Sequence, residues 1–249
     1  MVDLTDDELD RYARHIVLPQ VGGVGQNKLK AAKVAVIGAG GIGCAVIPAL
    51  AGAGIGRLSI IDDDTVELSN LHRQSLFRTA DVGHPKAPLA ASFVAAQNAF
   101  VDVRAVTERV DPANAAELLE GHDLIIDGSD NFATRLAVSD TCVALAIPLV
   151  SAAAIQFQGQ VGLFRARPCY RCFVGDAFDT EDCDTCAEAG VLGALTATVG
   201  GFAALLAINF IVGIGEDQSG KLHLFDGERL TWRAIVIPPD TACRACGSA

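Results

Sequence analysis

Residues 33–43 read KVAVIGAGGIG, and this stretch decides the fold. The apolar run 33–37 predicts a short buried strand, and the glycines at 38, 40, 41 and 43 open a helix of small residues that continues to about Ala53. Glycines in this setting allow a tight turn and let backbone N–H groups approach phosphate oxygens at the positive end of the helix. The stretch therefore predicts a nucleotide-binding turn. The alternative is that the glycines serve only close packing of helix on strand, and the motif does not identify the nucleotide.

Strands and helices alternate beyond this turn. The next strand ends at Asp62, at the offset where an acidic side chain binds a ribose hydroxyl. A helix with Leu89, Phe93 and Ala96 on one face follows. Alternation of this kind predicts an α/β fold with a Rossmann-like, doubly wound, mostly parallel sheet. The predicted strands are 57–61, 101–106, 124–126, 149–150 and 161–164, followed by a C-terminal antiparallel hairpin of 221–225 and 231–237.

We expect one domain over residues 1–249, because no repeat or low-complexity linker divides the chain. Its expected parts are an N-terminal helical segment at 1–32, a nucleotide-binding core at 33–164, a crossover loop at 165–190, and a helix with C-terminal strands at 191–249. The crossover loop has no periodicity and is long for a compact domain, which favours a functional role.

The 249 residues carry a formal net charge of −11 and are 51% hydrophobic. This charge argues against nucleic acid and anionic membranes as partners. The acidic, polar start predicts no export signal, so we expect a cytoplasmic protein. The uncharged stretch from Ala189 to Gly215 is long enough to cross a membrane, but it holds six glycines. We predict that it forms a helix buried in the core or at a subunit interface.

Polar residues near the expected phosphate cradle suggest its chemistry. Asn70, Arg73 and Gln74 lie at i, i+3 and i+4, so a helical turn would put them on one face; a solvated polar face is the alternative. Lys86 opens a helix after Pro85, where a cation is unfavourable unless an anion lies nearby.

Asp130 follows the strand 124–126, at the carboxyl edge where open sheets bind ligands. It could hold Mg²⁺ through carboxylate oxygen, or instead cap the next helix together with Asn131. Cations and a magnesium carboxylate around a phosphate cradle suit phosphoryl or adenylyl transfer. Hydride transfer needs none of them. A nicotinamide-dependent oxidoreductase and a catalytically silent binding module remain the competing hypotheses.

The chain has eight cysteines, and six of them form three Cys-x-x-Cys pairs. Without an export signal, such spacing favours metal or thiol chemistry over structural disulfides. The pairs are Cys169 with Cys172, Cys183 with Cys186, and Cys243 with Cys246, whereas Cys44 and Cys142 lie in apolar helical patterns and are expected to be buried and inert.

These features together resemble one family, the sulfur-carrier adenylyltransferases of molybdopterin and thiamine biosynthesis, which are bacterial relatives of the ubiquitin-activating enzymes. The resemblance runs in order along nearly the whole chain. It rests on residues 11–15 (RYARH), 25–29 (GQNKL), 38–43, 62–64 (DDD), 69–74 (SNLHRQ), 83–86 (GHPK), 130–131 (DN), 169–172 (CYRC), 186–191 (CAEAGV) and 243–246 (CRAC).

The resemblance implies a homodimer that binds ATP and Mg²⁺ and adenylylates the C-terminal Gly-Gly carboxylate of a ubiquitin-like sulfur carrier. Pyrophosphate leaves, and the acyl-adenylate awaits sulfur transfer. Arg14 would complete the neighbouring subunit's ATP site, and Asp62 would hold the ribose. The implied catalytic residues are Arg14, Arg73, Lys86, Asp130 and Cys186, and the implied nucleotide-binding residues are Gly38, Gly40, Gly41, Gly43, Asp62, Ser69, Asn70, Leu71, His72, Arg73, Gln74, Lys86, Asp130 and Asn131.

Two of the Cys-x-x-Cys pairs supply four thiolates and leave no open position, which is typical of a structural Zn²⁺ site formed by Cys169, Cys172, Cys243 and Cys246. The resemblance implies that Asp130 is the magnesium ligand. Cys186 matches a cysteine that forms a covalent link to the activated carrier in some members of the family, whereas in other members the adenylate leaves without such a link. Its acidic neighbours favour the second reading, because they raise a thiol pKa. The carrier could belong to the molybdopterin or the thiamine branch. We expect a separate sulfur donor, either a cysteine desulfurase or a rhodanese.

Overall fold

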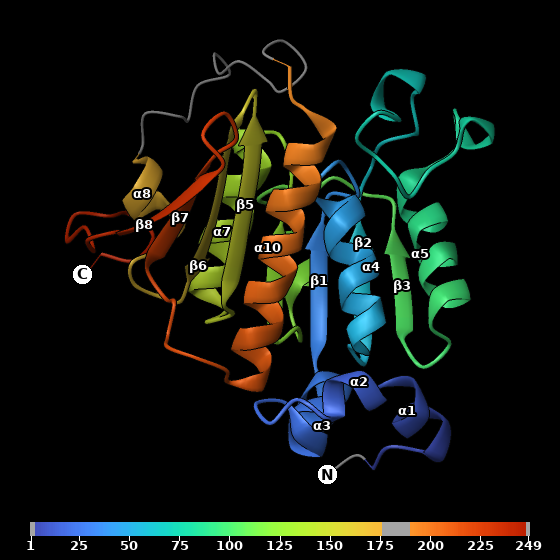
Figure 1. Ribbon diagram of the computed structural model, residues 1–249. Coiled ribbons are helices and arrows are strands. Elements are labelled where there is room, and N and C mark those ends of the chain that lie inside the picture. Colours follow the sequence, from blue (N-terminus) through green and yellow to red (C-terminus); the bar gives the residue numbers. More distant parts are fainter. Residues whose placement is uncertain (1–2, 176–189, 248–249) are drawn as a thin grey trace.

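A computed structural model describes residues 3–175 and 190–247. One eight-stranded sheet runs through the molecule, with helices on both of its faces (Figure 1). The elements are α1 (Asp6–Arg11), α2 (Ala13–Ile16), α3 (Gly22–Ala31), β1 (Lys33–Ile37), α4 (Gly43–Ala53), β2 (Arg57–Ile61), η1 (Leu68–Asn70), η2 (Thr79–Asp81), α5 (Lys86–Gln97), β3 (Asp102–Val106), α6 (Ala115–Leu119), β4 (Leu124–Asp127), α7 (Phe132–Ala144), β5 (Leu149–Ile155), β6 (Gln158–Phe164), α8 (Tyr170–Val174), α10 (Gly193–Val212), β7 (Lys221–Asp226) and β8 (Thr231–Val236).

The strand order is β3-β2-β1-β4-β5-β6-β7-β8. The first five strands in this order are parallel, and β6, β7 and β8 pair antiparallel. The predicted fold class is confirmed. The chain leaves β1 to one side and β4 to the other, so their carboxyl ends form a topological switch point, where open α/β sheets bind ligands.

Two strands are longer than predicted. β5 and β6 pair from Leu149↔Phe164 to Ile155↔Gln158, through a two-residue turn at residues 156–157. Gln156 has a φ of +52° in this turn. The run 151–160 was missed because alanine, glutamine and glycine have weak strand propensity, and pairing with neighbouring strands overrides it.

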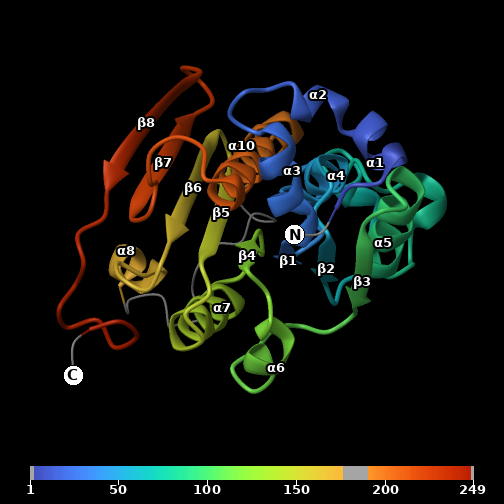
Figure 2. The same cartoon turned by 90° about the horizontal axis from the view of Figure 1, so that it is seen from below.

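Two helical layers cover the sheet, as the view along its lower edge shows (Figure 2). One apolar cluster joins the first strands to α4, α5 and α10, and the other lies beneath α6, α7 and α8. The face predicted for α5 is wrong: Phe93 is 39% exposed, while Ala87, Ala90 and Val94 are buried. Small side chains face inward there because α5 packs closely against its neighbours.

Helix α10 is the segment long and apolar enough to cross a membrane, among the residues that the structure describes. It packs against α4, β5 and β6. A Cβ on Gly200 would lie 2.6 Å from the Ile42 carbonyl oxygen, so the two helices touch through backbone. Half of its most apolar window is buried, and a core helix passes the same length test. Burial of this helix follows the prediction.

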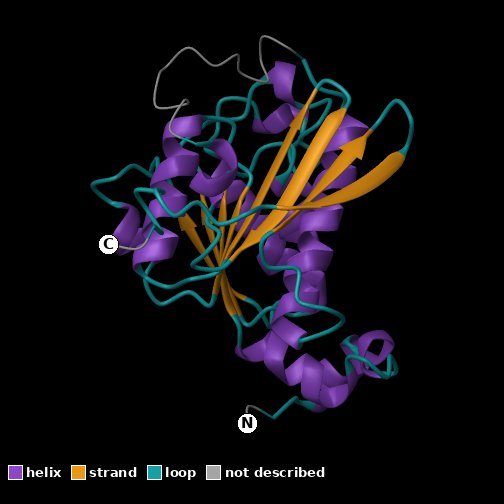
Figure 3. Cartoon of the chain, turned by 90° about the vertical axis from the view of Figure 1, so that its left-hand side faces the viewer, coloured by secondary structure: helices purple, strands orange, loops and turns teal. Residues whose placement is uncertain are grey.

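The N-terminal helices α1–α3 lie at the edge of the sheet where β1 begins, far from the glycine turn (Figures 1 and 3). Glu8, which is 2% exposed, fixes them. Its carboxylate accepts from Lys30 Nζ at 2.7 Å and from the Thr5 backbone N–H at 2.8 Å, while the Thr5 hydroxyl caps α1. This reciprocal capping box and ion pair attach α1 to α3.

Candidate nucleotide-binding site

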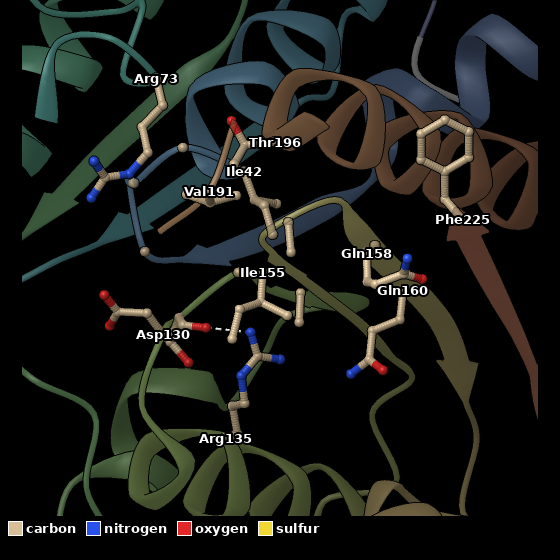
Figure 4. A pocket seen from close by; sticks show the side chains of 18 of the residues that line it. Ile42, Arg73, Asp130, Arg135, Ile155, Gln158, Gln160, Val191, Thr196 and Phe225 are labelled. Carbon is tan, nitrogen blue, oxygen red and sulfur yellow. Dashed lines mark hydrogen bonds between the residues drawn. The ribbon is translucent and has the colours of Figure 1, made fainter. Parts of the chain in front are cut away.

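A cavity of about 780 Å³ lies over the carboxyl ends of β1, β2 and β4 and continues along β5–β8. Figure 4 shows Arg73 on one side of it, Asp130 and Arg135 on the other, and Gln158 and Gln160 further along. This is the switch point of the sheet. The cavity is large enough for a nucleotide together with part of a second substrate.

The glycine turn forms one wall. Gly38 has a φ of +87°, a left-handed conformation that favours glycine, and lies against the backbone of Gly128 after β4. A Cβ on Gly43 would approach the Gly38 carbonyl oxygen to 2.0 Å. Gly43 therefore serves packing of α4 on β1 and does not line the cavity, while Gly38, Gly40 and Gly41 do.

Asp62 lies at the end of β2 and is 8% exposed. Its two carboxylate oxygens accept backbone N–H groups from Ala39 at 2.6 Å and from Asp64 at 2.9 Å. Burial raises the pKa of Asp62, against the opposing effects of Lys86 and these N–H donors. The carboxylate thus ties the glycine turn to β2 and lines the cavity, where a ribose hydroxyl could reach it.

The turn after η1 brings Asn70, Arg73 and Gln74 to the cavity, as their spacing predicts. The backbone N–H groups of Arg73 and Gln74 both donate to the Asn70 carbonyl, and the Arg73 guanidinium donates to Asn70 Oδ1 at 2.8 Å. Ser69 and His72 contact the same guanidinium through a carbonyl oxygen and a ring nitrogen. Leu71 packs on the core. These last three residues do not line the cavity.

Lys86 is the first residue of α5 and is 3% exposed. Its ammonium group lies 2.7 Å from Asp64 Oδ2. A cation at the start of a helix is favourable only beside an anion, and the Asp64 carboxylate is one such anion. Sequence reasoning overlooked this pairing, although Asp64 is part of the acidic run 62–64.

Asp130 is exposed on the opposite wall, and Asn131 caps α7 by accepting the Thr134 backbone N–H at 2.8 Å. The capping alternative therefore holds for Asn131, which leaves the Asp130 carboxylate available to a cation. Asp130 lines the cavity and Asn131 does not. An exposed carboxylate in a cavity that Arg73 and Lys86 also line fits Mg²⁺.

A buried network that sequence reasoning missed supports this wall. Asp127 is fully buried and Arg135 is 5% exposed, and they form an ion pair at 3.6 Å. Asp127 Oδ1 accepts the Ser129 hydroxyl at 2.7 Å, and Arg135 donates to the Ser129 carbonyl. Arg135 also donates to the Ala152 carbonyl at 2.8 Å. The sequence signal for this network is Asp127, an acidic residue at the end of a strand.

The antiparallel strands provide the far wall. Gln158 and Gln160 lie two residues apart on β6, so they share a face, and they pair with Asp226 and Leu224 of β7. Arg233 on β8 continues this face. The result is a polar strip that leads away from the glycine turn. None of these residues was predicted.

Arg14 lies on α2 and is exposed. It does not line its own chain's cavity, because α2 belongs to the opposite edge of the sheet (Figure 1). Cys183 and Cys186 lie outside the described residues. Cys44 and Cys142 are buried, as predicted, and burial raises the pKa of the Cys44 thiol to about 12.

The four cysteines Cys169, Cys172, Cys243 and Cys246 come together, with all sulfur atoms within 4.8 Å of one another. Cys169 Sγ lies 3.6 Å from Cys243 Sγ, and Cys172 Sγ lies 3.4 Å from Cys246 Sγ. Thiolates about 2.3 Å from a tetrahedral zinc would be about 3.8 Å apart. The cluster therefore fits a closed structural zinc site.

The fold and the cavity define a class, the nucleotide-binding doubly wound α/β proteins. Comparison with known protein families identifies a narrower group within this class, because residues 12–245 match the ThiF family. The chain is 44% identical to the sulfur carrier protein adenylyltransferase of Thermus thermophilus, covering 98% of this chain and 92% of that protein. It is 41% identical to the SAMP-activating enzyme E1 of Haloferax volcanii, with 99% and 92% covered. The chain belongs to the ThiF family.

Other matches differ in length or are more distant. The adenylyltransferase and sulfurtransferase MOCS3 of Anopheles gambiae is 41% identical, but this chain spans only 56% of that protein. Among solved structures, MccB of E. coli with ATP superposes with a TM-score of 0.83 at 24% identity, covering 96% of this chain and 74% of that one. This last likeness concerns the fold alone.

Proposed function

We propose that this chain, as a single adenylation domain over residues 1–249, is an adenylyltransferase that uses ATP to activate the C-terminal carboxylate of a sulfur carrier protein. The observation that carries the proposal is the cavity, where the glycine turn, Arg73, Lys86 and Asp130 face one space. The relatives named for adenylyltransfer to a sulfur carrier match nearly the whole chain at 41–44% identity, which supports the same activity here.

Each group in the cavity has a part in this proposal. The glycine turn and the start of α4 receive phosphate oxygens through backbone N–H groups, and Asp62 accepts from the ribose. Arg73 and Lys86 neutralise charge on the phosphates as the carboxylate attacks the α-phosphate and pyrophosphate leaves. Asp130 would hold Mg²⁺, which supplies further charge neutralisation when bound.

The polar strip of Gln158, Gln160 and Arg233 suits the second substrate. An extended peptide lying along it would reach the nucleotide with its C-terminal carboxylate, and small terminal residues such as Gly-Gly would fit closest to the glycine turn. We propose a ubiquitin-like carrier of this kind, from the molybdopterin or the thiamine branch. Its sulfur would come from a separate cysteine desulfurase or rhodanese.

Assembly completes the proposal. Arg14 lies on α2 and does not line its own chain's cavity, which supports a homodimer in which it serves the partner's site. We place the protein in the cytoplasm. Cys186 is proposed to act, if at all, after adenylation, so Cys186→Ala should leave pyrophosphate exchange unchanged.

Titration calorimetry tests the nucleotide, with ATP and NAD as ligands. We expect ATP to bind and NAD not to bind. Pyrophosphate formation should then require a carrier that ends in Gly-Gly and stop when these two residues are deleted. Binding of NAD in preference to ATP would overturn the proposal, and so would pyrophosphate formation indifferent to the deletion.

A further inference from the structure

The two residues between Cys169 and Cys172 are both buried. Tyr170 is 2% exposed and Arg171 is 6% exposed. A short Cys-x-x-Cys turn that only held zinc would have no need to bury a tyrosine and an arginine. Their partners explain their burial.

Arg171 fixes this turn to helix α7. Its guanidinium donates to both carboxylate oxygens of Asp140, at 2.6 and 2.9 Å. A bidentate pair of this kind holds both orientation and distance. The ion pair is half shielded, with the Arg171 side chain 5% and the Asp140 side chain 40% exposed.

Tyr170 lies near Arg135, which is about one and a half turns before Asp140 on the same helix, α7. Its ring packs edge-on against Phe164 and Phe173, at centroid distances of 5.7 and 6.1 Å. Its side chain is in polar contact with Arg135, and both residues line the cavity. Tyr170 therefore connects the cysteine cluster to the cavity, because it follows Cys169 in the chain and lines the cavity.

Arg135 carries this contact to the cavity wall. It binds the Ser129 carbonyl, which belongs to the peptide bond that joins Ser129 to Asp130, and it pairs with Asp127, which holds the Ser129 hydroxyl. The backbone on the N-terminal side of Asp130 is thus held by Arg135, and Arg135 is held in part by Tyr170.

We propose that Tyr170 is a positioning residue through which the four-cysteine cluster sets the place of the Asp130 wall. The cluster joins residues 169–172 to 243–246 and so fixes the tyrosine; the tyrosine orients Arg135; and Arg135 orients the segment that carries Asp130. The zinc site therefore has a second role beyond stability: it is energetically linked to nucleotide binding. This inference rests on the proposed function, because it takes ATP with Mg²⁺ as the ligand of the cavity.

Linkage is reciprocal, which gives a readout other than activity. If the cluster positions the nucleotide wall, a nucleotide on that wall must stabilise the cluster. In the zinc-loaded protein, saturating ATP with Mg²⁺ should slow zinc transfer to the chelator 4-(2-pyridylazo)resorcinol at least about fivefold. Tyr170→Phe, which removes only the hydroxyl, should reduce this protection to less than about twofold while still binding ATP.

The chain offers a matched control, because Tyr12 is its other tyrosine. Tyr12 is 3% exposed, and its hydroxyl accepts from Asn98 Nδ2 at 2.9 Å, at the edge of the sheet remote from the cavity. Tyr12→Phe deletes an equally buried, hydrogen-bonded hydroxyl. It should keep the full zinc protection. Arg135→Lys, which keeps the charge but loses the planar fork, should behave like Tyr170→Phe.

Kinetics separate positioning from general stability. Tyr170→Phe should lower kcat for carrier-dependent pyrophosphate exchange about tenfold. It should raise the KM for ATP by no more than the coupling itself, about fivefold. Equal behaviour of the Tyr170→Phe and Tyr12→Phe proteins would overturn the inference, as would unprotected zinc in a wild-type protein that binds ATP. Failure of the wild-type protein to bind ATP would contradict the proposed function instead.

Discussion

The ammonium group of Lys86 lies 2.7 Å from the carboxylate of Asp64 at the mouth of the cavity. The side chain of the lysine is 4% exposed and that of the aspartate 56% exposed. Lys86 begins α5, where the helix dipole disfavours a cation. Asp64 offsets this without enclosing the lysine, because an ammonium group has three N–H donors and Asp64 accepts one of them. A phosphate can therefore approach the remaining donors.

This relationship predicts opposite results for the two partners. Lys86→Met should lower carrier-dependent pyrophosphate exchange by about 10²-fold or more, because it removes a preorganised charge from the phosphates. Asp64→Asn should keep exchange within about threefold, since it removes only the anion that competes with phosphate. Steady-state kinetics with ATP varied would test both variants. An Asp64→Asn enzyme as inactive as Lys86→Met would mean that the carboxylate takes part in the reaction.

Arg14 gives a prediction about assembly. If each site takes Arg14 from the partner, an Arg14→Ala chain and an Arg73→Ala chain should complement each other. Half of the dimers in an equal mixture are heterodimers, and each contains one intact site, so exchange should recover to about a quarter of the wild-type level. Native mass spectrometry can verify that subunits exchanged. No recovery in a verified mixture would show that Arg14 acts within its own chain or not at all.

The cysteine cluster predicts one zinc ion per chain. Four sulfur atoms within 4.8 Å leave no open coordination position for a catalytic water. Elemental analysis of the purified protein should give close to one zinc per chain, and Cys243→Ser should lower both the zinc content and the melting temperature. Cys142→Ser, a change at a buried cysteine outside the cluster, should keep the zinc. A wild-type protein without stoichiometric zinc would contradict the assignment.

Glu8 gives a prediction about pH. Burial raises the pKa of Glu8, but hydrogen bonds from Lys30 and Thr5 outweigh it, so the pKa ends below its ordinary value of 4.5. A carboxyl group with a lowered folded pKa stabilises the fold above its unfolded pKa, and this contribution disappears as the pH falls through the folded pKa. Glu8→Gln should therefore cost about 1–2 kcal/mol of unfolding free energy at pH 7, and less at pH 3 than at pH 7.

Urea denaturation at both pH values measures this difference. Asp10→Asn is the control, because Asp10 lies in the same helix and is exposed. Its unfolding free energy should change little at either pH. A Glu8→Gln penalty that persists unchanged at pH 3 would mean that the carboxylate charge is not what fixes α1 to α3.

Local patterns predicted many of the residues that line the cavity. The glycine turn, Asp62 and Asp130 follow strands, Lys86 opens a helix, and Asn70, Arg73 and Gln74 share one short turn; all of these residues except Gly43 line one cavity. Such residues are predictable because the carboxyl ends of parallel strands meet at one edge. The ligand roles of Ser69, Leu71, His72 and Asn131 came with the resemblance. In the structure the His72 ring contacts Arg73, the Ser69 hydroxyl donates to Glu67, Leu71 packs on the core and Asn131 caps a helix.

Long-range pairing was not predictable in the same way. Arg135 meets Asp127 and Tyr170 only because α7 and α8 pack on the same face, and the polar strip exists only because β6, β7 and β8 pair in one register. The run 151–160 does not predict this register, because its side chains have weak strand preference. The cavity wall that would receive the second substrate therefore emerged only in three dimensions.

Carrier-dependent ATP–pyrophosphate exchange tests the central claim most directly. The wild-type protein with a Gly-Gly carrier, ATP and Mg²⁺ should incorporate labelled pyrophosphate into ATP, because adenylylation of a carboxylate is reversible while the adenylate stays bound. Asp130→Ala and Arg73→Ala should each lower the rate by at least about 10²-fold while keeping the wild-type circular dichroism spectrum. Exchange that proceeds without the carrier, or that survives both substitutions in folded protein, would contradict adenylyl transfer at this site.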